Sequence, residues 1–435
     1  MNKKSTSKYF LFLILVFLLI TFAAPVFGEE SGEPAEISAG DTSWVLTASA
    51  LVLLMTIPGL ALFYGGMVRN KNVLSTMMHS FIAVCVVSIV WVLWGYTIAF
   101  GSDISGIIGS FEFLGLRGVG AEAFSGTAIP HLAFMVFQLM FAGITVALIS
   151  GAIAERMKFS AFILFAILWA TFIYSPLAHW VWGGGWLMEL GALDFAGGTV
   201  VHISSGVAAL AAALVLGKRH GFGTEKMAPH NVPFTLIGAS LLWVGWFGFN
   251  AGSALAANGI AAGAFVATHV ATAAGVLSWL VVEWAYRGKP TALGAASGAV
   301  AGLVAITPAA GFVGPISAIV IGVGAGAFCY GAVLWKSKLG FDDALDVLAI
   351  HGIGGSWGAI ATGLFASVGG ATGLFFGNPG QVAIQAIAVG ATWVFSFVGT
   401  FIILKVLDMT IGLRVTVEEE VLGLDIGQHN ETAYS

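Results

Sequence analysis

The sequence predicts an all-α polytopic membrane protein with eleven transmembrane helices. Of its 435 residues, 58% are hydrophobic and only 9% are Asp, Glu, Lys or Arg, whereas charged residues make up roughly 25% of an ordinary soluble domain. The mean hydropathy is +0.95. So few charged side chains cannot cover a soluble globule of this length, and the remaining apolar surface is therefore expected to face lipid.

The first 28 residues are typical of a secretory signal peptide. Three lysines precede an apolar run at 10–22, and small residues at positions 26 and 28 suit a cleavage site. An uncleaved anchor helix is the alternative interpretation. Residues 29–42 are acidic and polar, and we expect them to form an extracellular arm.

Apolar windows of about 20 residues, the length that spans a bilayer, fill residues 43–408 as a single membrane domain. No gap between them could hold a separate soluble domain, and residues 409–435 remain as a tail. The expected spans are 43–67, 75–100, 128–154, 159–179, 196–217, 233–253, 259–284, 292–309, 312–336, 346–370 and 380–408.

The basic residues predict the orientation of the spans, because lysine and arginine are retained on the cytoplasmic side. With the mature N-terminus outside, Arg117 is the single basic residue of the outer loops. The tail is then cytoplasmic. The inner side holds 13 basic residues, namely Arg69, Lys71, Arg156, Lys158, Lys218, Arg219, Lys226, Arg287, Lys289, Lys336, Lys338, Lys405 and Arg414.

An internal repeat divides the spans into two halves. In each half an aspartate precedes a histidine by eight residues, and a glycine follows the histidine four residues later. The two sets are Asp194, His202 and Gly206, and Asp343, His351 and Gly355. Spans 1–5 and 6–10 would form the halves, with span 11 as an extra element. Because five is odd, the second half is inverted, an arrangement that transporters use to place a site between their halves.

Inversion brings His202 and His351 toward the middle of the bilayer from opposite sides. Ionisable groups at that depth are costly and are candidates for function, although a single buried histidine is more often a hydrogen bonder between helices. An imidazole can donate from one nitrogen and accept at the other, and its charge changes near neutral pH. The pair therefore suits binding of a small amine or transfer of a proton.

Other polar residues inside or beside the spans have less specific interpretations. Asp194 is expected to cap the start of span 5, and Asp343, with Asp342 and Asp346, to begin a solvated helix. His269, in the middle of span 7, is expected to form a hydrogen bond that packs two helices together.

Aromatic residues add a second candidate site at the outer end of the spans. Trp182 precedes three glycines and the first histidine helix, so its π face could attract a small cation. A tryptophan of the interfacial belt is an equally good interpretation. The positions of Phe141 and Phe249 predict no role beyond packing.

The composition also argues against several functions. The net charge is −5 and no basic tract could follow a phosphate backbone, which argues against nucleic-acid binding. Cys85 and Cys329 both lie in apolar runs, so a disulfide scaffold or a CxxC site is not expected. No enzymatic, cofactor or metal site is predicted. An intramembrane metal or haem protein using the two histidines remains a weaker alternative.

The segment LDFAGGTVVH at 193–202 resembles the signature of the ammonium transporter (Amt/Mep/Rh) family, and the likeness covers nearly all of the mature chain. The bacterial or archaeal Amt branch is more similar than the Rh branch. Further matching segments are PGLALFYGG at 58–66, FQLMFAGITVALISGAIAER at 137–156, GWFGFNAGS at 245–253, GLVAITPAAGFVG at 302–314, DDALDVLAIHGIGG at 342–355 and GLRVTVEEEVLGLD at 412–425.

The resemblance implies roles for the matching positions. An outer recruitment site would hold ammonium against the Trp182 π face and the Ser253 hydroxyl. Phe141 and Phe249 would form a phenyl gate, and His202 and His351 would line a hydrophobic pore. The remaining residues of the outer site would be Phe137, Trp246, the Ala196 carbonyl and Asp194, the last through its charge.

Membership would also imply partners and a location. Relatives form homotrimers in the cell membrane, with one pore per subunit, and many bacterial members are blocked from the cytoplasm by a PII-type signal protein. The tail from Gly412 onward resembles the segment that cooperates in that control. An ammonium sensor that signals with little flux is the alternative function.

A dry pore lined by imidazoles could separate ammonium from potassium. The two ions have the same charge and similar size, so a charged hole would not distinguish them. Ammonium can shed a proton and potassium cannot. We therefore expect deprotonation near the gate, passage of ammonia along the histidines, and a proton route that involves the same imidazoles.

Overall fold

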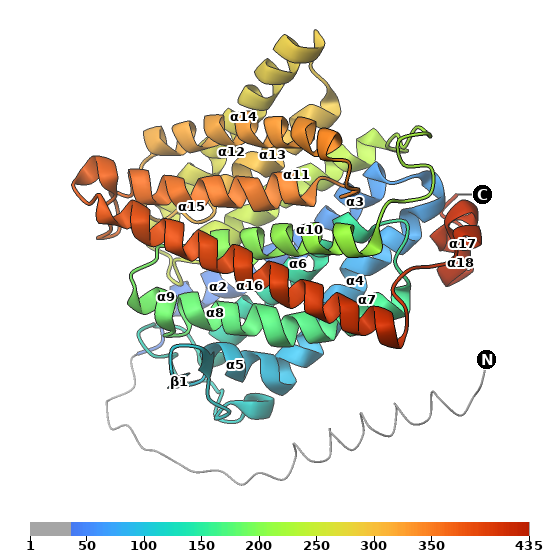
Figure 1. Cartoon of the computed structure of the whole chain (residues 1–435). Coiled ribbons are helices and arrows are strands. Elements are labelled where there is room, and N and C mark those ends of the chain that lie inside the picture. Colours follow the sequence, from blue (N-terminus) through green and yellow to red (C-terminus); the bar gives the residue numbers. More distant parts are fainter. Residues whose placement is uncertain (1–35, 435) are drawn as a thin grey trace. The chain divides into compact units, whose positions relative to one another are not determined.

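Ten helices of the computed structural model, which describes residues 36–434, are long and apolar enough to cross a membrane. Each overlaps one of the expected spans. Figure 1 shows these helices, coloured along the sequence. The predicted signal peptide lies outside the described residues. The spans are Ala39–Met67, Asn70–Phe100, His131–Ile153, Phe159–Glu189, Gly198–Leu216, Val232–Gly252, Gly259–Arg287, Pro315–Leu339, Leu348–Phe365 and Gly380–Thr410.

The eighth expected span, 292–309, is a shorter apolar helix, α13, which covers Ala292–Ile306. Its 15 residues rise only about 22 Å at 1.5 Å per residue. Pro308 follows directly after the C-cap Thr307, and proline does not extend a helix because it lacks the backbone N–H group.

The first half of the described chain contains helices α2 to α10. Several spans change from α-helix to π-helix and back along their length. The helical bounds are α2 (Ala39–Leu54), η1 (Met55–Leu60), α3 (Ala61–Met67), η2 (Asn70–Asn72), α4 (Val73–Val90), η3 (Trp91–Gly95), α5 (Tyr96–Phe100), η4 (Leu114–Leu116), α6 (His131–Ile153), α7 (Phe159–Trp169), η5 (Ala170–Tyr174), α8 (Ser175–Trp182), α9 (Trp186–Glu189), η6 (Gly198–Ile203) and α10 (Ser204–Leu216).

The first half also contains one short antiparallel strand pair among the described residues. Its strands, β1 (Asp103–Ile104) and β2 (Ile108–Gly109), lie in the loop after α5.

The second half repeats the pattern of long helices and adds a helical tail. The remaining helices are α11 (Val232–Gly252), α12 (Gly259–Arg287), α13, α14 (Pro315–Leu339), η7 (Leu348–Ile353), α15 (Gly354–Phe365), η8 (Leu374–Phe376), α16 (Gly380–Thr410), α17 (Val417–Leu422) and α18 (Leu424–His429).

Helix α2 begins four residues before the expected first span. Ser38 accepts a hydrogen bond from the Asp41 backbone amide at 3.2 Å, which satisfies one of the free amides at the helix start. The end of the predicted polar arm, residues 39–42, is therefore helical.

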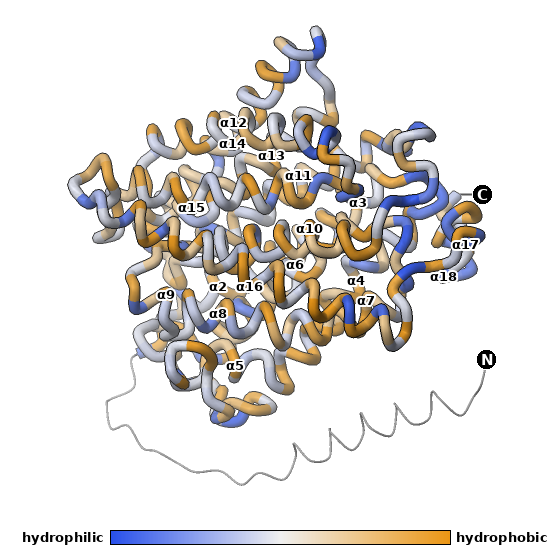
Figure 2. The backbone as a smooth tube through the Cα atoms, viewed as in Figure 1, coloured by the Kyte–Doolittle hydropathy of each residue, from blue (hydrophilic) through white to orange (hydrophobic). Residues whose placement is uncertain are grey.

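Hydropathy divides the molecule into an apolar body and polar ends. Figure 2 shows that the long helices are mostly hydrophobic, while hydrophilic residues gather near the ends of helices, above all beside α17 and α18. Within the apolar body, almost every residue of α6 is buried, as is almost every residue of α10. In contrast, α12, α14 and α16 each expose large hydrophobic side chains.

His269 lies on an outward face of α12 and is exposed. Its ring contacts in the described part of the chain are with Trp243, at a centroid distance of 5.4 Å, and Phe247, at 6.3 Å. The expected hydrogen bond between helices is therefore wrong. The buried face of α12, which includes Ala264, Thr268 and Ala271, is turned away from position 269.

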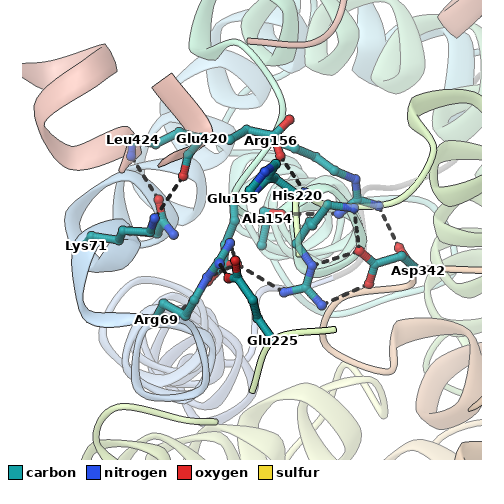
Figure 3. A network of polar contacts seen from close by, with 12 residues as sticks. Arg69, Lys71, Ala154, Glu155, Arg156, His220, Glu225, Asp342, Glu420 and Leu424 are labelled. Atoms are coloured by element: carbon teal, nitrogen blue, oxygen red, sulfur yellow. Dashed lines mark hydrogen bonds and ion pairs between the residues drawn. The ribbon is translucent and has the colours of Figure 1, made fainter. Parts of the chain in front are cut away.

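Hydrogen bonds join the tail to loops and helix ends, beside a cluster of buried ion pairs (Figure 3). Arg219 donates to both carboxylate oxygens of Asp342 at 2.8 Å and to Glu155 at 3.2 Å. Glu420 of α17 pairs with Arg414 and accepts the His220 amide. Burial would raise the pKa of Glu155, but the nearby arginines outweigh it and lower the pKa.

The expectation of a solvated helix start at residues 342–346 is wrong for two of its three aspartates. The exposed fraction is 1% for Asp342 and 0% for Asp343. Arg219 compensates the charge of Asp342, and its hydrogen bond contributes to a pKa for Asp342 below the usual value. A buried carboxylate is stable only with such partners. Asp346 is more exposed and pairs with Lys336.

Candidate functional site

The two repeat histidines meet in the buried interior of the helix bundle. His202 lies in η6 and His351 in η7, with exposed fractions of 1% and 3%. Their Nδ1 atoms are 3.2 Å apart, and the two rings lie nearly parallel with centroids 5.3 Å apart. One Nδ1 must carry a proton and the other must not for this hydrogen bond to form. The predicted meeting of the two side chains is confirmed.

Both histidines lie in short π-helical segments at the start of their spans. Such π-helical turns are rare and occur frequently at functional sites. In the first half, Asp194 accepts hydrogen bonds from the amides of Gly197 at 2.7 Å, Gly198 at 2.6 Å and Thr199 at 2.7 Å, and also from the Thr199 hydroxyl. The predicted capping role of Asp194 is therefore confirmed.

The repeat glycines allow the two halves to come this close. A Cβ atom on Gly206 would lie 2.1 Å from the backbone nitrogen of Gly352, next to His351. One on Gly355 would lie 3.1 Å from both the Gly198 oxygen and the Cβ of His202. Each glycine thus faces the histidine segment of the other half, which explains its place in the repeated spacing.

A column of aromatic rings continues from the histidines. Trp246 stacks on His202 at a centroid distance of 5.4 Å, and the Phe249 ring lies 6.0 Å from the same imidazole. Phe249 and Phe141 are stacked at 4.1 Å with 20° between their planes. Trp182 meets Phe141 edge-on at 5.9 Å. The four rings come from three different spans and form one continuous path.

A cavity of about 280 Å³ lies at the Trp182 end of this column. Its lining includes Trp182, Ser253, Phe137, Phe141 and Gln138, but neither Phe249 nor either histidine. Phe141 and Phe249 are 1% and 0% exposed. The stacked phenyl rings therefore lie between the cavity and the two imidazoles.

Three residues expected at the outer site, Trp246, Ala196 and Asp194, are not part of the cavity lining. Trp246 lies deeper, against His202, and its indole nitrogen donates to the Thr307 hydroxyl at 2.9 Å. Ala196 is fully buried in the turn before η6. Asp194 contributes indirectly, since its backbone oxygen accepts the Trp182 indole N–H at 2.9 Å and so orients that ring.

Gln138 is a site residue that the sequence reasoning missed. It follows Phe137 on α6, lines the cavity and has an exposed fraction of 9%. A signal was present in the sequence, because it is the only glutamine, asparagine or acidic residue between His131 and Ile153. A lone amide in such an apolar span is costly unless it has a partner.

The arrangement does not resemble a metal centre or a nucleophilic site. Among residues 36–434 there is no group of three or more His, Cys, Asp or Glu side chains that could hold a metal ion. What the site offers is an aromatic cavity with a few polar atoms, a ring gate, and two coupled imidazoles. This combination can hold a small cation at one end and exchange a proton at the other.

Comparison with known proteins gives a consistent result. The model of the Ammonium Transporter Family matches residues 43–434. The ammonium transporter of Bacillus subtilis is 58% identical over 91% of this chain and 98% of its own length. Ammonium transporter Amt1 of Archaeoglobus fulgidus is 52% identical over 92% of this chain and 100% of its own length.

Solved structures agree with the sequence relatives. The crystal structure of Candida albicans Mep2 has a TM-score of 0.84 at 38% identity and covers 88% of both chains. A structure titled Sensor Amt Protein has a TM-score of 0.84 at 32% identity, covering 89% of this chain and 98% of its own. The family match spans most of the sequence and the relatives are matched over nearly their full lengths. The chain therefore belongs to the ammonium transporter family.

Proposed function

We propose that this chain is a multi-pass membrane transporter that recruits ammonium in the Trp182 cavity, deprotonates it and conducts ammonia past His202 and His351. The transport of ammonium itself is supported by the family match and by the bacterial and archaeal relatives. The observation that carries the mechanism is the continuous column from Trp182 through Phe141 and Phe249 to the paired imidazoles.

Recruitment would depend on an aromatic face and on oxygen lone pairs. The Ser253 hydroxyl donates its proton to the Phe249 carbonyl oxygen at 2.8 Å, so it can offer only lone pairs to the cavity. The Trp182 N–H group is occupied by the Asp194 carbonyl, which leaves the indole π face to attract the cation. Phe137 would complete the aromatic surroundings, while Asp194, Ala196 and Trp246 would support the site from behind.

Deprotonation would occur where the phenyl gate excludes water. A charge is costly in such an apolar place, whereas neutral ammonia can pass. The His202 Nε2 atom has no hydrogen-bond partner within residues 36–434, so with the ring proton on Nδ1 its lone pair would accept the proton that ammonium loses. The Nδ1–Nδ1 hydrogen bond then offers the proton a route between the two rings.

The wider setting is inferred from the sequence and the family. We propose eleven spans in two inverted halves, an outer N-terminus after removal of residues 1–28, and a cytoplasmic tail at 409–435. The protein would reside in the plasma membrane as a homotrimer. The docked tail would form part of the binding surface for a PII-type signal protein.

A sensor with little flux is the second candidate, favoured by one observation, the structural likeness to the Sensor Amt Protein. The two functions share the cavity and differ in the step after ammonium binds. In a sensor the tail would respond to occupancy while the histidine pair stays unused.

Reconstitution in liposomes tests the proposal. A jump in external ammonium should produce a current, and an equal jump in potassium should produce none. His202→Ala should abolish the ammonium current because it removes the proton route. Full current with intact potassium exclusion in that variant would rule out the mechanism. Ammonium binding without current or ammonia flux in the unaltered protein would favour the sensor.

A further inference from the structure

The His179 side chain joins α8 to two other elements. It lies three residues before Trp182 and has no exposed surface. Its Nδ1 atom is 3.0 Å from the backbone oxygen of Ala99, and its Nε2 atom is 2.8 Å from Oδ1 of Asp103. Ala99 lies in the last turn of the second span, and Asp103 belongs to β1.

Both partners of this imidazole can only accept hydrogen bonds. A backbone carbonyl oxygen carries no proton, and neither does an ionised carboxylate. Both contacts are therefore hydrogen bonds only when both ring nitrogens carry a proton, which makes His179 an imidazolium. The hydrogen bond from His179 lowers the pKa of the Asp103 carboxyl, which keeps that partner ionised. A buried cation needs such a partner, and the last carbonyls of a helix also favour a positive charge.

The backbone of the same histidine holds the chain that follows Trp182. The His179 carbonyl oxygen accepts the amides of Gly183 and Gly185, each at 3.0 Å. A Cβ atom on Gly183 would lie 2.0 Å from the Ala99 oxygen, so this segment packs directly against the end of the second span. The imidazole and the segment that carries the Trp182 indole therefore share one attachment point.

Asp103 extends the attachment to the strand pair. Its carboxylate accepts the Gly106 amide, at 2.9 Å to Oδ1 and 3.0 Å to Oδ2. The Gly106 oxygen in turn accepts the Trp186 amide at 3.0 Å. Because Trp186 begins α9 directly after the three glycines, the turn that follows Trp182 is held at both of its ends.

Asp103 is the charged group that bonds to the His179 ring, and it is an exposed residue. The protonation of this ring can therefore respond to the solution outside the cavity. The other titratable side chains on and beside the elements packed against α8 make no hydrogen bond or ion pair with the ring within residues 36–434. They are Tyr96 of α5, Tyr174 of η5, Glu189 of α9, His202 of η6, Asp194 before η6, and Glu112.

We propose that His179, as an imidazolium, is a positioning residue for ammonium recruitment, because its two N–H groups hold the segment that carries Trp182. This inference rests on the proposed transport function and adds to it a residue that does not line the cavity. Loss of one ring proton leaves a nitrogen facing an acceptor without a hydrogen between them, so the indole shifts and ammonium binds less tightly. The phenyl gate and the histidine pair remain, so the KM changes more than the maximal current.

Asp103→Asn tests the protonation in liposomes with ammonium as the substrate. Asparagine offers an N–H group to Nε2, so a neutral imidazole can keep both contacts. An imidazole changes its charge near neutral pH. The KM of the unaltered protein divided by that of Asp103→Asn should therefore rise about threefold or more between about pH 5.5 and about pH 9, as expected for one lost hydrogen bond. Taking this ratio cancels the effect of pH on the ammonium–ammonia equilibrium.

Glu112→Gln is the matched control. It makes the same exchange of a carboxylate for an amide in the same loop, where Glu112 bonds to Ser102 and not to α8. Its KM should follow that of the unaltered protein at every pH. A ratio for Asp103→Asn that stays constant with pH, a change confined to the maximal current, or an equal effect of Glu112→Gln would overturn the assignment.

If Asp103→Asn does not fold, Asp103→Ser takes its place. Serine also removes the carboxylate that requires the second ring proton, so the same KM ratio should again rise with pH, and a constant ratio contradicts the proposal. Failure of transport itself looks different, because the unaltered protein would then carry no ammonium current at any pH.

Discussion

The turns that precede the two histidine helices have the same sequence spacing but different hydrogen bonding. The Asp194 carboxylate accepts three amides within 2.7 Å and a hydroxyl. The Asp343 carboxylate accepts the Leu348 amide at 2.8 Å through Oδ2. Its Oδ1 has no hydrogen-bond partner among the described residues, although the side chain is fully buried.

The backbone explains the difference. Gly197 adopts a φ of +110°, a conformation that glycine reaches without strain, and this turn directs successive amides at Asp194. In the other half the turn contains Asp346, with a φ of +60°, and Lys336 donates to the Asp343 backbone oxygen. A repeated spacing therefore preserves where the histidine lies but not how the preceding aspartate is used. The first aspartate is a complete cap, and the second keeps one oxygen free.

Among the variants that test the difference between the two turns, Asp194→Asn should cause the largest loss of stability and of ammonium current. The carboxylate accepts five hydrogen bonds in all. Asparagine replaces one carboxylate oxygen with an NH2 group, so N–H donors that had an acceptor would face another donor. Loss of about 3 kcal/mol of stability is expected when a buried charged network is broken in this way. The start of η6 and the orientation of Trp182 would change together. Thermal unfolding and ammonium current in liposomes measure both consequences.

The same substitution at the equivalent aspartate of the other half, Asp343→Asn, is the control for that prediction. Asp343→Asn should cost far less, because the Leu348 amide can still bond to the remaining carbonyl oxygen. Equal losses of stability and current in the two variants would mean that both aspartates are equivalent caps, contrary to the hydrogen bonding described above.

The repeat glycines provide a second, smaller contrast. Gly206→Ala places a Cβ atom 2.1 Å from the Gly352 nitrogen, so the backbones must move apart and the imidazole contact lengthens. Overpacking of this kind costs about 1–3 kcal/mol, and ammonium current should be lost. Gly355→Ala meets its neighbours at 3.1 Å and should keep part of the current. A variant pair with the reverse order of currents would contradict this account.

The sequence could predict the meeting of the histidines because spacing and inversion depend only on the chain's periodicity. It could not predict the burial of Asp342, since Arg219, its partner, comes from a loop more than a hundred residues earlier. The prediction for His269 was wrong because periodicity does not show which face of α12 points outward.

Asp343→Asn should also change how the stability of the protein depends on pH. This is the smallest of the expected effects. Burial raises the pKa of the Asp343 carboxyl, and nearby Lys336 opposes the shift only in part. The native state therefore holds a proton that the unfolded chain has already lost above about pH 4. This contribution to stability is full at lower pH and is lost as the pH rises through the raised pKa. Asparagine cannot titrate, so the variant's unfolding temperature should fall less between about pH 4 and pH 8 than that of the unaltered protein. Identical pH dependence in both proteins would mean that Asp343 is already ionised across this range and that its free oxygen is compensated by Lys336.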